Sequence, residues 1–385
     1  MEKNYFGAIE FGSLYTNILI VSYHHNKIDV VATAKVESAG FYNGEITDLD
    51  AFNDSLSEAL NEVLKKYKIL LDEVILVLPS NNHKVYCAKV SNKVLTERQI
   101  IGKVQFESIR SNIKKAQIGT DETLVYEIPT LYTLDGDRVL RSAPINYQSS
   151  TLTITSNIHT LPKTIVENLR NALILKKVSI LGQYINCNCN AVATSHNYDL
   201  EGECIVINFG QEVTTISGFS KNLLVKSINI NFGIDTLITY LAYNLKVDKK
   251  YAKTLFESYF VCDNEYSSDV IFDEENNLSE KRISGIILNR LYTGFNEILD
   301  ACLKLKADCK FADDVKYLVT GLLNDYEFFI SELVKYSYLE IKEGSINVVG
   351  INEQSYVNCY GAILMFIEEN QELIASRLEN DEEIE

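Results

Sequence analysis

The sequence predicts an α/β protein in which two related domains enclose a cleft and a small α+β subdomain is inserted into the first domain. Strand-rich segments open both halves of the 385-residue chain, at 5–36 and 203–230, and helical segments follow each of them. A ten-residue pattern recurs 198 residues after its first copy. A block at 83–161 has strands and turns of its own. Together these observations indicate a duplicated domain that carries one insertion.

The composition narrows the class of protein. Hydrophobic residues make up 46% and charged residues 23% of the chain, which is typical of a globular protein. The net charge of −17 repels phosphate backbones, so it argues against nucleic-acid binding and favours a basic peptide as partner. The eight cysteines are scattered, the N-terminus lacks a secretory leader, and no run of 18 apolar residues exists. We therefore expect a reduced, cytoplasmic protein without a membrane-spanning helix.

The first domain is expected at 1–82 and is completed by 162–200 and by a C-terminal helix at 356–368. Its opening strands are rich in β-branched and aromatic residues and are separated by short polar turns. The expected elements are three strands within 1–36, strands at 73–79 and 178–182, and helices at 50–67, 162–176, 185–195 and 356–368.

The inserted subdomain at 83–161 has the element order β-α-β-β-β. Its strands are separated by turn signals of their own, at Asp135-Gly136 and Pro144. The expected elements are a strand at 84–91, a helix at 96–115 and strands at 123–129, 137–144 and 151–157.

The second domain is expected at 201–225 and 313–355, with a helical subdomain at 226–312 between its two parts. Its strands repeat the pattern of the N-terminus, and the acidic tail at 369–385 is expected to fray. The expected elements are three strands within 203–230, helices at 232–245, 248–258 and 279–305, an acidic loop at 261–278 and short strands at 315–319 and 346–349.

The sharpest signal is the repeat itself. Residues 9–18 and 207–216 both follow the pattern I-[E/N]-F-G-x-x-x-T-[N/T]-I, with an apolar strand on each side. Gly12 and Gly210 allow a tight turn, and successive N–H groups in such a turn can bind an anion. Two such turns across a cleft would hold a nucleoside triphosphate. The alternative is a chance likeness between two strand–turn–strand units.

Further motifs make the chain resemble a known family. Val319-Thr320-Gly321 follows a strand, and with the two hairpins this is the layout of the actin-like ATPase superfamily, which has a ribonuclease H-like two-domain fold. Within it, the chain is similar to the FtsA family of bacterial cell-division proteins. The most specific match is Ile128-Pro129-x-x-Tyr132-x-Leu134-Asp135-Gly136, followed by Ala143-Pro144-Ile145. The segment at 355–364 resembles the closing helix of the family, so the resemblance covers about residues 5–368.

The resemblance implies a set of nucleotide-binding residues, if binding is retained, and it assigns no catalytic residue. Several positions depart from the family pattern. Tyr15 stands where the family has a phosphate-contacting lysine, Asn208 and Thr215 stand where it has acids, and Glu212 stands where it has glycine. The implied binding residues are Glu10, Gly12, Ser13, Asn208, Gly210, Thr214, Thr320 and Gly321.

These departures weaken the case for chemistry on ATP with Mg²⁺, the cofactor that the resemblance implies. A carboxylate at Glu212 about 4 Å from a phosphate oxygen costs about 4 kcal/mol per unit charge at an effective dielectric constant near 20. Without acids at positions 208 and 215, groups that would hold Mg²⁺ and orient an attacking water are missing. We therefore expect hydrolysis to be weak or lost, while weakened nucleotide binding and purely structural hairpins both stay open.

Other candidate sites are better explained by structure. Cys187 and Cys189 lack further ligands at metal spacing, so we expect no metal site. The acidic loop at 261–278 is expected to be solvated, with a dock for a basic segment as the alternative. The histidines, at positions 24, 25, 83, 159 and 196, are expected at the surface.

The leading interpretation is a non-enzymatic scaffold for the division ring. By resemblance, the helical subdomain at 226–312 would bind the C-terminal tail of FtsZ, with Arg290 as the one contact that we name. Copies of the chain and other division proteins would also be partners. The end of the chain is acidic where the family has a basic amphipathic helix, so the membrane would be reached indirectly or through a missing helix, at the cytoplasmic face of the division site. An active ATPase and a pilus-assembly actin-like protein are the alternatives, and the element at 128–136 disfavours the second.

Overall fold

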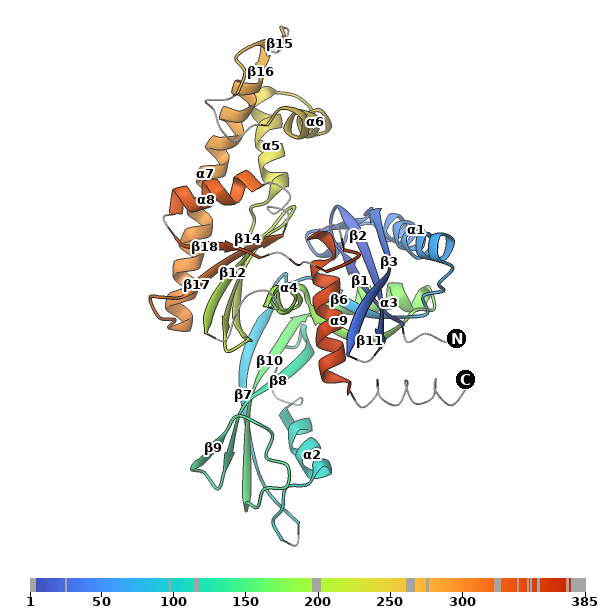
Figure 1. Cartoon of the computed structure of the whole chain (residues 1–385), viewed down its shortest axis with the longest axis vertical. Coiled ribbons are helices and arrows are strands. Elements are labelled where there is room, and N and C mark those ends of the chain that lie inside the picture. Colours follow the sequence, from blue (N-terminus) through green and yellow to red (C-terminus); the bar gives the residue numbers. More distant parts are fainter. Residues whose placement is uncertain are drawn as a thin grey trace. The chain divides into compact units, whose positions relative to one another are not determined.

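The structure is a computed structural model of the whole chain, and it forms two compact units (Figure 1). One unit combines Met1–Ser80 with Lys176–Glu385, and the other is Asn81–Leu175. The described residues are 5–24, 26–96, 98–113, 118–195, 202–260, 267–274, 277–321, 327–337, 339–344, 346, 348–351, 354–371 and 374.

The first sheet of the larger unit has the strand order β11-β6-β1-β2-β3. The three N-terminal strands are antiparallel, and β6 and β11 extend the sheet by parallel pairing. Strand β6 is buried from Val74 to Leu78, as its continuous apolar run predicts. Helix α1 (Leu49–Tyr67), capped by the side chain of Asp48, packs on β3 and β2. The strands are β1 (Tyr5–Phe11), β2 (Tyr15–His24), β3 (Lys27–Glu37), β6 (Glu73–Leu78) and β11 (Ser179–Ile185).

The second sheet repeats the first, with the order β14-β13-β12-β17-β18. Its hairpin has the same register at an offset of 198 residues: Ile9 pairs with Ile18, and Ile207 pairs with Ile216. The predicted duplication is thus confirmed at the level of individual strand pairs. The strands are β12 (Glu203–Phe209), β13 (Thr214–Ser220), β14 (Leu223–Ile230), β17 (Lys316–Gly321) and β18 (Ile341–Glu343).

Two helices lie side by side next to the first sheet: α4 (Asn186–Ser195) and α9 (Val357–Glu369) (Figure 1). Helix α9 also packs on β1 and β6. The helices approach closely because Gly361 lies against the backbone of α4. A Cβ atom at Gly361 would lie 1.9 Å from the carbonyl oxygen of Cys189. The short elements near this sheet are β4 (Phe41–Tyr42), β5 (Glu45–Ile46) and the 3-10 helix η2 (Gln354–Tyr356).

Helices gather on the second sheet around a shared hydrophobic core that includes Phe232, Leu291 and Phe295. The three predicted helices are confirmed, while α8 was not predicted. The prediction of a loop at 261–278 is wrong in part, because β15 (Ile271–Asp273) pairs with β16 (Leu278–Ser279). Leu278 is fully buried. The helices are α5 (Ile234–Leu245), α6 (Lys249–Tyr259), α7 (Glu280–Cys309) and α8 (Glu327–Ser337).

The smaller unit is a four-stranded sheet with the order β7-β10-β8-β9, packed against α2. Arg110 of α2 fixes the helix on the sheet, since its Nε donates to Glu127 Oε2 at 2.6 Å and the Glu127 side chain is fully buried. Helix α3 contacts β8 and β10 and groups with this unit, whereas we had expected it in the first domain. The elements are β7 (Lys84–Lys93), α2 (Lys103–Ile113), β8 (Glu122–Leu134), β9 (Arg138–Leu140), β10 (Thr151–Pro162) and α3 (Lys163–Leu175).

One predicted helix start and one predicted strand are wrong, each for a physical reason. The helix predicted from 96 begins only at Lys103, because Ile101 exchanges backbone hydrogen bonds with Tyr147 and Asn146 of a facing loop. The strand predicted at 346–349 is absent among the described residues of that segment. Its place beside β17 is taken by β18, and the N–H of Gly344 donates to Val319 O at 2.7 Å. In the described residues, no helix is both long and apolar enough to span a membrane.

Candidate functional site

The two repeated hairpins turn in the same way. The N–H of Gly12 donates to Tyr15 O at 3.0 Å, and the N–H of Gly210 donates to Val213 O at 3.0 Å. A Cβ at Gly210 would lie 2.6 Å from Val213 O, and one at Gly12 would lie 3.0 Å from Tyr15 O. Glycine is therefore required at position 210 and favoured at position 12 by the closeness of the turn to its own backbone.

The repeated threonines hold each hairpin to the end of its third strand. Thr16 Oγ1 lies 3.1 Å from Ser38 Oγ, and Thr214 Oγ1 donates to Phe232 O at 2.7 Å. Thr214 was predicted as a nucleotide-binding residue. Its side chain is fully buried, and its hydroxyl is committed to the segment that leads into α5.

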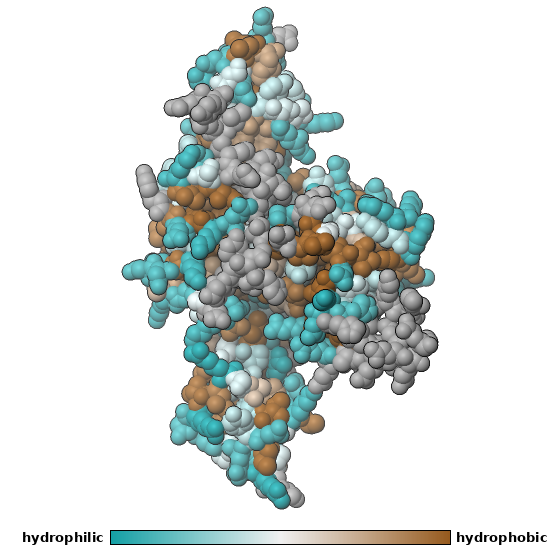
Figure 2. Space-filling model, in the orientation of Figure 1, coloured by the Kyte–Doolittle hydropathy of each residue, from teal (hydrophilic) through white to brown (hydrophobic). Residues whose placement is uncertain are grey.

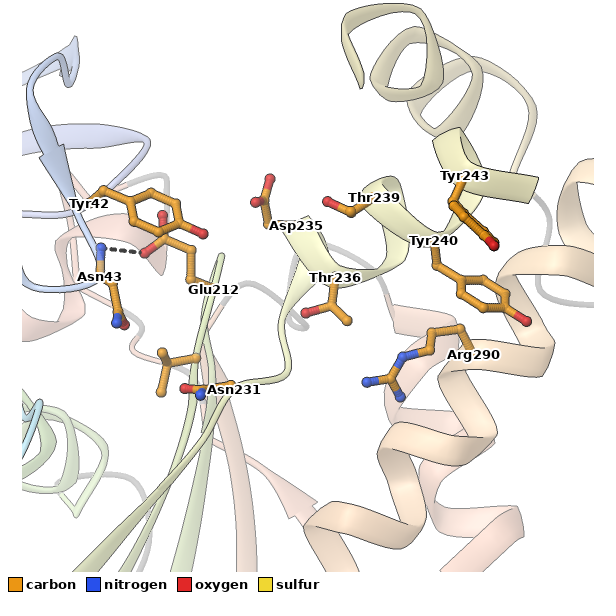
Figure 3. A pocket seen from close by; sticks show the side chains of 11 residues that line it. Tyr42, Asn43, Glu212, Asn231, Asp235, Thr236, Thr239, Tyr240, Tyr243 and Arg290 are labelled. Carbon is orange, nitrogen blue, oxygen red and sulfur yellow. Dashed lines mark hydrogen bonds between the residues drawn. The ribbon is translucent and has the colours of Figure 1, made fainter. Parts of the chain in front are cut away.

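The hairpins face each other, as the predicted cleft requires. Ser13 Oγ of the first hairpin donates to Glu212 Oε2 of the second at 2.5 Å. The backbone N–H of Asn43 donates to the same oxygen at 2.8 Å (Figure 3). Deeper inside, the hydroxyls of Ser80 and Thr215 lie 3.1 Å apart. The site therefore brings together residues that are 199 and 135 positions apart in the sequence.

Glu212 also lines an open cavity of about 590 Å³ (Figure 3). One wall comes from the β4–β5 hairpin and the other from α5 and α7. Arg290 reaches the cavity from α7, but its guanidinium donates to Glu297 at 3.1 Å and lies over the ring of Phe232. The lining residues are Tyr42, Asn43, Glu212, Val213, Asn231, Asp235, Thr236, Thr239, Tyr240, Tyr243 and Arg290.

The electrostatics at Glu212 reflect its enclosure. Burial raises the pKa of this carboxyl, while the hydrogen bonds from Ser13 and Asn43 lower it. The charge of Asp235 also raises the pKa, and Lys249, which pairs with Asp235 at 2.5 Å, lowers it. Burial is the largest of these effects. The hydrogen bonds from Ser13 and Asn43 oppose it by stabilising the charged form of the carboxyl.

Glu10, the predicted acid of the first hairpin, points away from this cavity toward α9. Asn358 Nδ2 donates to Glu10 Oε1 at 2.6 Å. The residue keeps some exposed surface, but its carboxyl lies deep between β1 and α9, and burial raises its pKa to about 7. The structure thus ties Glu10 to the closing helix and does not bring it to Ser13 or Glu212.

The remaining predicted residues meet where β12 pairs with β17. Asn208 is paired with Thr320, and Phe209 is paired with Gly321. Gly321 has a φ of +90°, and a Cβ there would lie 2.3 Å from Asn208 Oδ1, so the family glycine is kept for a steric reason. The hydroxyl of Thr320 is buried without a hydrogen-bond partner in the described part of the chain. Leu322, which stands where the resemblance to FtsA implies a second glycine, lies outside the described residues.

The donors at the start of α5 are already used. The N–H of Asp235 donates to Gln211 O at 2.8 Å, and that of Ile234 donates to Gly210 O at 3.4 Å. A helix N-terminus often binds phosphate, but here it holds the turn of the second hairpin. With a carboxylate at Glu212 and no acids at positions 208 and 215, the donor set does not fit a magnesium triphosphate.

Sequence reasoning was wrong about two histidines. His83 and His159, predicted at the surface, are buried and stacked, with His83 Nε2 3.1 Å from His159 Nδ1. Burial lowers the pKa of both rings, that of His83 to about 4. His24 is half-buried at the end of β2, and positions 25 and 196 lie outside the described residues. The only signal in the sequence was the apolar strand around His159.

The two cysteines considered as metal ligands behave as core residues. Cys187 and Cys189 are both buried, and burial raises the pKa of Cys187 to about 12. In the described part of the chain, no group of three or more His, Cys, Asp or Glu side chains is arranged to hold a metal ion.

Comparison with known proteins relates the chain to one family by sequence. No protein-family model matches it. It is 22% identical over 314 residues to the cell division protein FtsA of Staphylococcus epidermidis, covering 79% of this chain and 67% of that protein. It is 21% identical over 258 residues to FtsA of Streptococcus pneumoniae, covering 67% and 56%. The chain is thus similar in sequence to FtsA proteins, at low identity. The match to FtsA of Rhizobium meliloti, 24% identical, spans about half of that protein's length, 49%.

Solved structures place the chain in the actin-like fold. A PilM–PilN type IV pilus biogenesis complex matches 94% of this chain and 98% of the compared chain, with a TM-score of 0.64 and 12% identity. The ethanolamine utilization protein EutJ of Carboxydothermus hydrogenoformans matches with a TM-score of 0.54 and 11% identity, covering 94% and 90%. At such identities these likenesses support the fold class, which agrees with the predicted actin-like, two-domain α/β architecture.

Proposed function

We propose that the protein is an FtsA-like, actin-related scaffold of the bacterial division ring, with nucleotide hydrolysis weak or lost. The similarity to FtsA in sequence and the actin-like fold support a role in cell division. The proposal that hydrolysis is weak or lost rests on the residues of the second hairpin. There, in register with the first hairpin, Asn208, Glu212 and Thr215 replace the residues expected to serve a magnesium triphosphate.

The residues that stand at these positions make contacts that join the two halves of the larger unit. Glu212 accepts from Ser13, and Thr215 lies within hydrogen-bond distance of Ser80. Asn229 Nδ2 adds a hydrogen bond of 2.9 Å to Ser80 O. Such contacts join the halves directly through protein groups, which suits a scaffold better than an enzyme that must open and close.

We further propose that the helical block at 226–312 binds the C-terminal tail of FtsZ. Its β15–β16 hairpin supports this, because residues 261–278 carry six acidic and no basic side chains. The hairpin region also exposes Val270, Ile271 and Phe272, and it is visible as a hydrophobic patch at the tip that carries β15 (Figure 2). A peptide with basic and apolar residues would find complementary groups here. Arg290, in the cavity of the same block, remains the single named contact.

Other parts of this proposal concern assembly. The unit at 81–175 would contact further copies of the chain or other division proteins, by analogy with the inserted subdomain of FtsA. The protein would act at the cytoplasmic face of the membrane, which it would reach through a partner or a membrane-binding helix. These assignments rest on the relationship to FtsA.

Calorimetric titration of the full chain with a peptide that copies the end of FtsZ from the same organism tests the scaffold role. We expect saturable binding with a dissociation constant on the order of tens of micromolar, weakened by salt because the tail is basic. A scrambled peptide is the control. Arg290→Ala should weaken binding, whereas Lys304→Ala, an exposed change on the same helix, should not. No binding at this concentration would remove FtsZ as partner.

A role in pilus assembly is the second candidate, and one observation favours it. The PilM–PilN complex matches nearly the whole chain in structure. The sequence relatives and the element at 128–136 favour division instead. Co-purification with a PilN-like protein, together with failure of the FtsZ titration, would reverse this order. A Mg²⁺-dependent ATPase rate would support the remaining alternative, an active actin-like ATPase.

A further inference from the structure

We propose that the carboxylate of Glu212 occupies a phosphate-type anion site formed by Ser13 and Asn43. In this position it links the two repeated hairpins in place of a nucleotide. Both donors meet a single oxygen, Oε2, at 2.5 Å from Ser13 Oγ and 2.8 Å from the N–H of Asn43. A hydroxyl and a backbone N–H that converge on one anionic oxygen are the donor types that bind phosphate oxygens in proteins. The inference holds whether or not the partner is FtsZ.

The repeat explains why only one hairpin supplies the anion. At the offset of 198 residues, Glu212 corresponds to Leu14, and Ser13 corresponds to Gln211. The first hairpin therefore offers a short hydroxyl donor, while the second offers a carboxylate long enough to reach it. Figure 3 shows the Glu212 side chain extending from its hairpin to Asn43 of the β4–β5 hairpin. The two turns share a backbone hydrogen bond but carry complementary side chains.

The neighbouring cations are paired with other carboxylates, so these two hydrogen-bond donors are the main groups that stabilise the Glu212 carboxylate. Lys249 forms its ion pair with Asp235, and Arg290 of the cavity wall forms its ion pair with Glu297. Glu212 makes hydrogen bonds to two neutral donors, one of them a backbone group that a mutation of the side chain leaves in place. Truncating Glu212 should thus free both donors and remove one negative charge from the same spot. The vacated site should accept an inorganic phosphate chain.

Titration with inorganic pyrophosphate, in the absence of added metal, tests this assignment on the full chain. We expect the wild type to show no binding and Glu212→Ala to bind, with an affinity gain on the order of a hundredfold or more. Glu45→Gln removes one charge from the exposed edge of the facing hairpin and serves as the matched control, for which we expect no gain. Adding Ser13→Ala to Glu212→Ala should abolish the gained binding.

Glu212→Gln keeps the length of the side chain and covers the case in which the truncated protein does not fold. It should bind pyrophosphate more tightly than the wild type, though less tightly than Glu212→Ala, because the amide still competes for Ser13. Binding by the wild type that equals either variant would overturn the proposal, and so would absence of binding in every folded variant. Neither failure would affect the FtsZ titration, so the two proposals fail separately.

Discussion

Glu10 lies in β1, where its carboxyl makes a contact that ties the first hairpin to a distant part of the chain. The resemblance to FtsA makes it the acid of the first nucleotide hairpin, and it holds the predicted place in β1. Its carboxyl, however, accepts a hydrogen bond from Asn358 of α9. The sequence predicted the strand and the turn, but it contained no sign that a residue 348 positions away would bind this acid.

The burial of Glu10 should make stability depend on pH. Because its pKa is raised from 4.5 to about 7, the folded state binds more protons than the unfolded state between these values. Stability should therefore be fully present below pH 4.5 and should fall as the pH rises through 7, by on the order of 3 kcal/mol. Glu10→Gln keeps an acceptor for Asn358 and removes the charge. We expect it to raise the free energy of unfolding at pH 8, with little effect at pH 4.5.

Urea denaturation of the wild type and of Glu10→Gln at the two pH values measures this difference. Asn358→Ala provides a second test, because loss of the donor should make the pH dependence of the wild-type acid steeper. A Glu10→Gln variant that is equally destabilised at both pH values would show that the carboxylate is held by stronger contacts than its burial and Asn358 imply.

At the scale of elements, the crossing of α4 and α9 is the contact that depends most on one residue. Gly361 lies so close to Cys189 O that any side chain would force the helices apart, and both helices pack on the first domain. Gly361→Ala should lower the free energy of unfolding by about 3 kcal/mol or more, because a packed backbone contact cannot yield as a flexible side chain can.

Gly285→Ala is the matched control for this prediction. Gly285 lies in α7, and a Cβ there would meet no atom within 4 Å. The change should raise stability by up to about 1 kcal/mol, because alanine favours the helix. Thermal and urea denaturation of both variants gives the comparison. Equal effects of the two changes would contradict a tight contact at Gly361.

Elements were predictable where the pattern was local. The hairpins, α1, α5 and α7 follow from apolar spacing and turn residues, so their existence could be read directly. Segment 98–102 could not, because its helix-like composition is overridden by pairing with a loop near Tyr147. Strand β18 (Ile341–Glu343) was missed because only one of its residues is apolar; as an edge strand it exposes Lys342 and Glu343.

At the scale of the whole molecule, the duplication could be predicted most fully from the sequence. The contacts between the two hairpins could be predicted least. The offset of 198 residues holds from the sequence motif down to single strand pairs, so the facing hairpins followed from the repeat. The resemblance to FtsA also led us to expect that Glu212 would oppose a phosphate. It could not show that Ser13 and Asn43 would bind that carboxylate, because the contact depends on how two distant turns come together.

The release of phosphate from ATP by the purified chain tests the central claim most directly: the paired hairpins bind each other rather than a magnesium triphosphate. With Mg²⁺ and ATP in excess, we expect phosphate release no faster than that of a heat-inactivated sample. A Mg²⁺-dependent rate that is abolished by Glu10→Ala would contradict the account, because it would show that the first hairpin still serves catalysis.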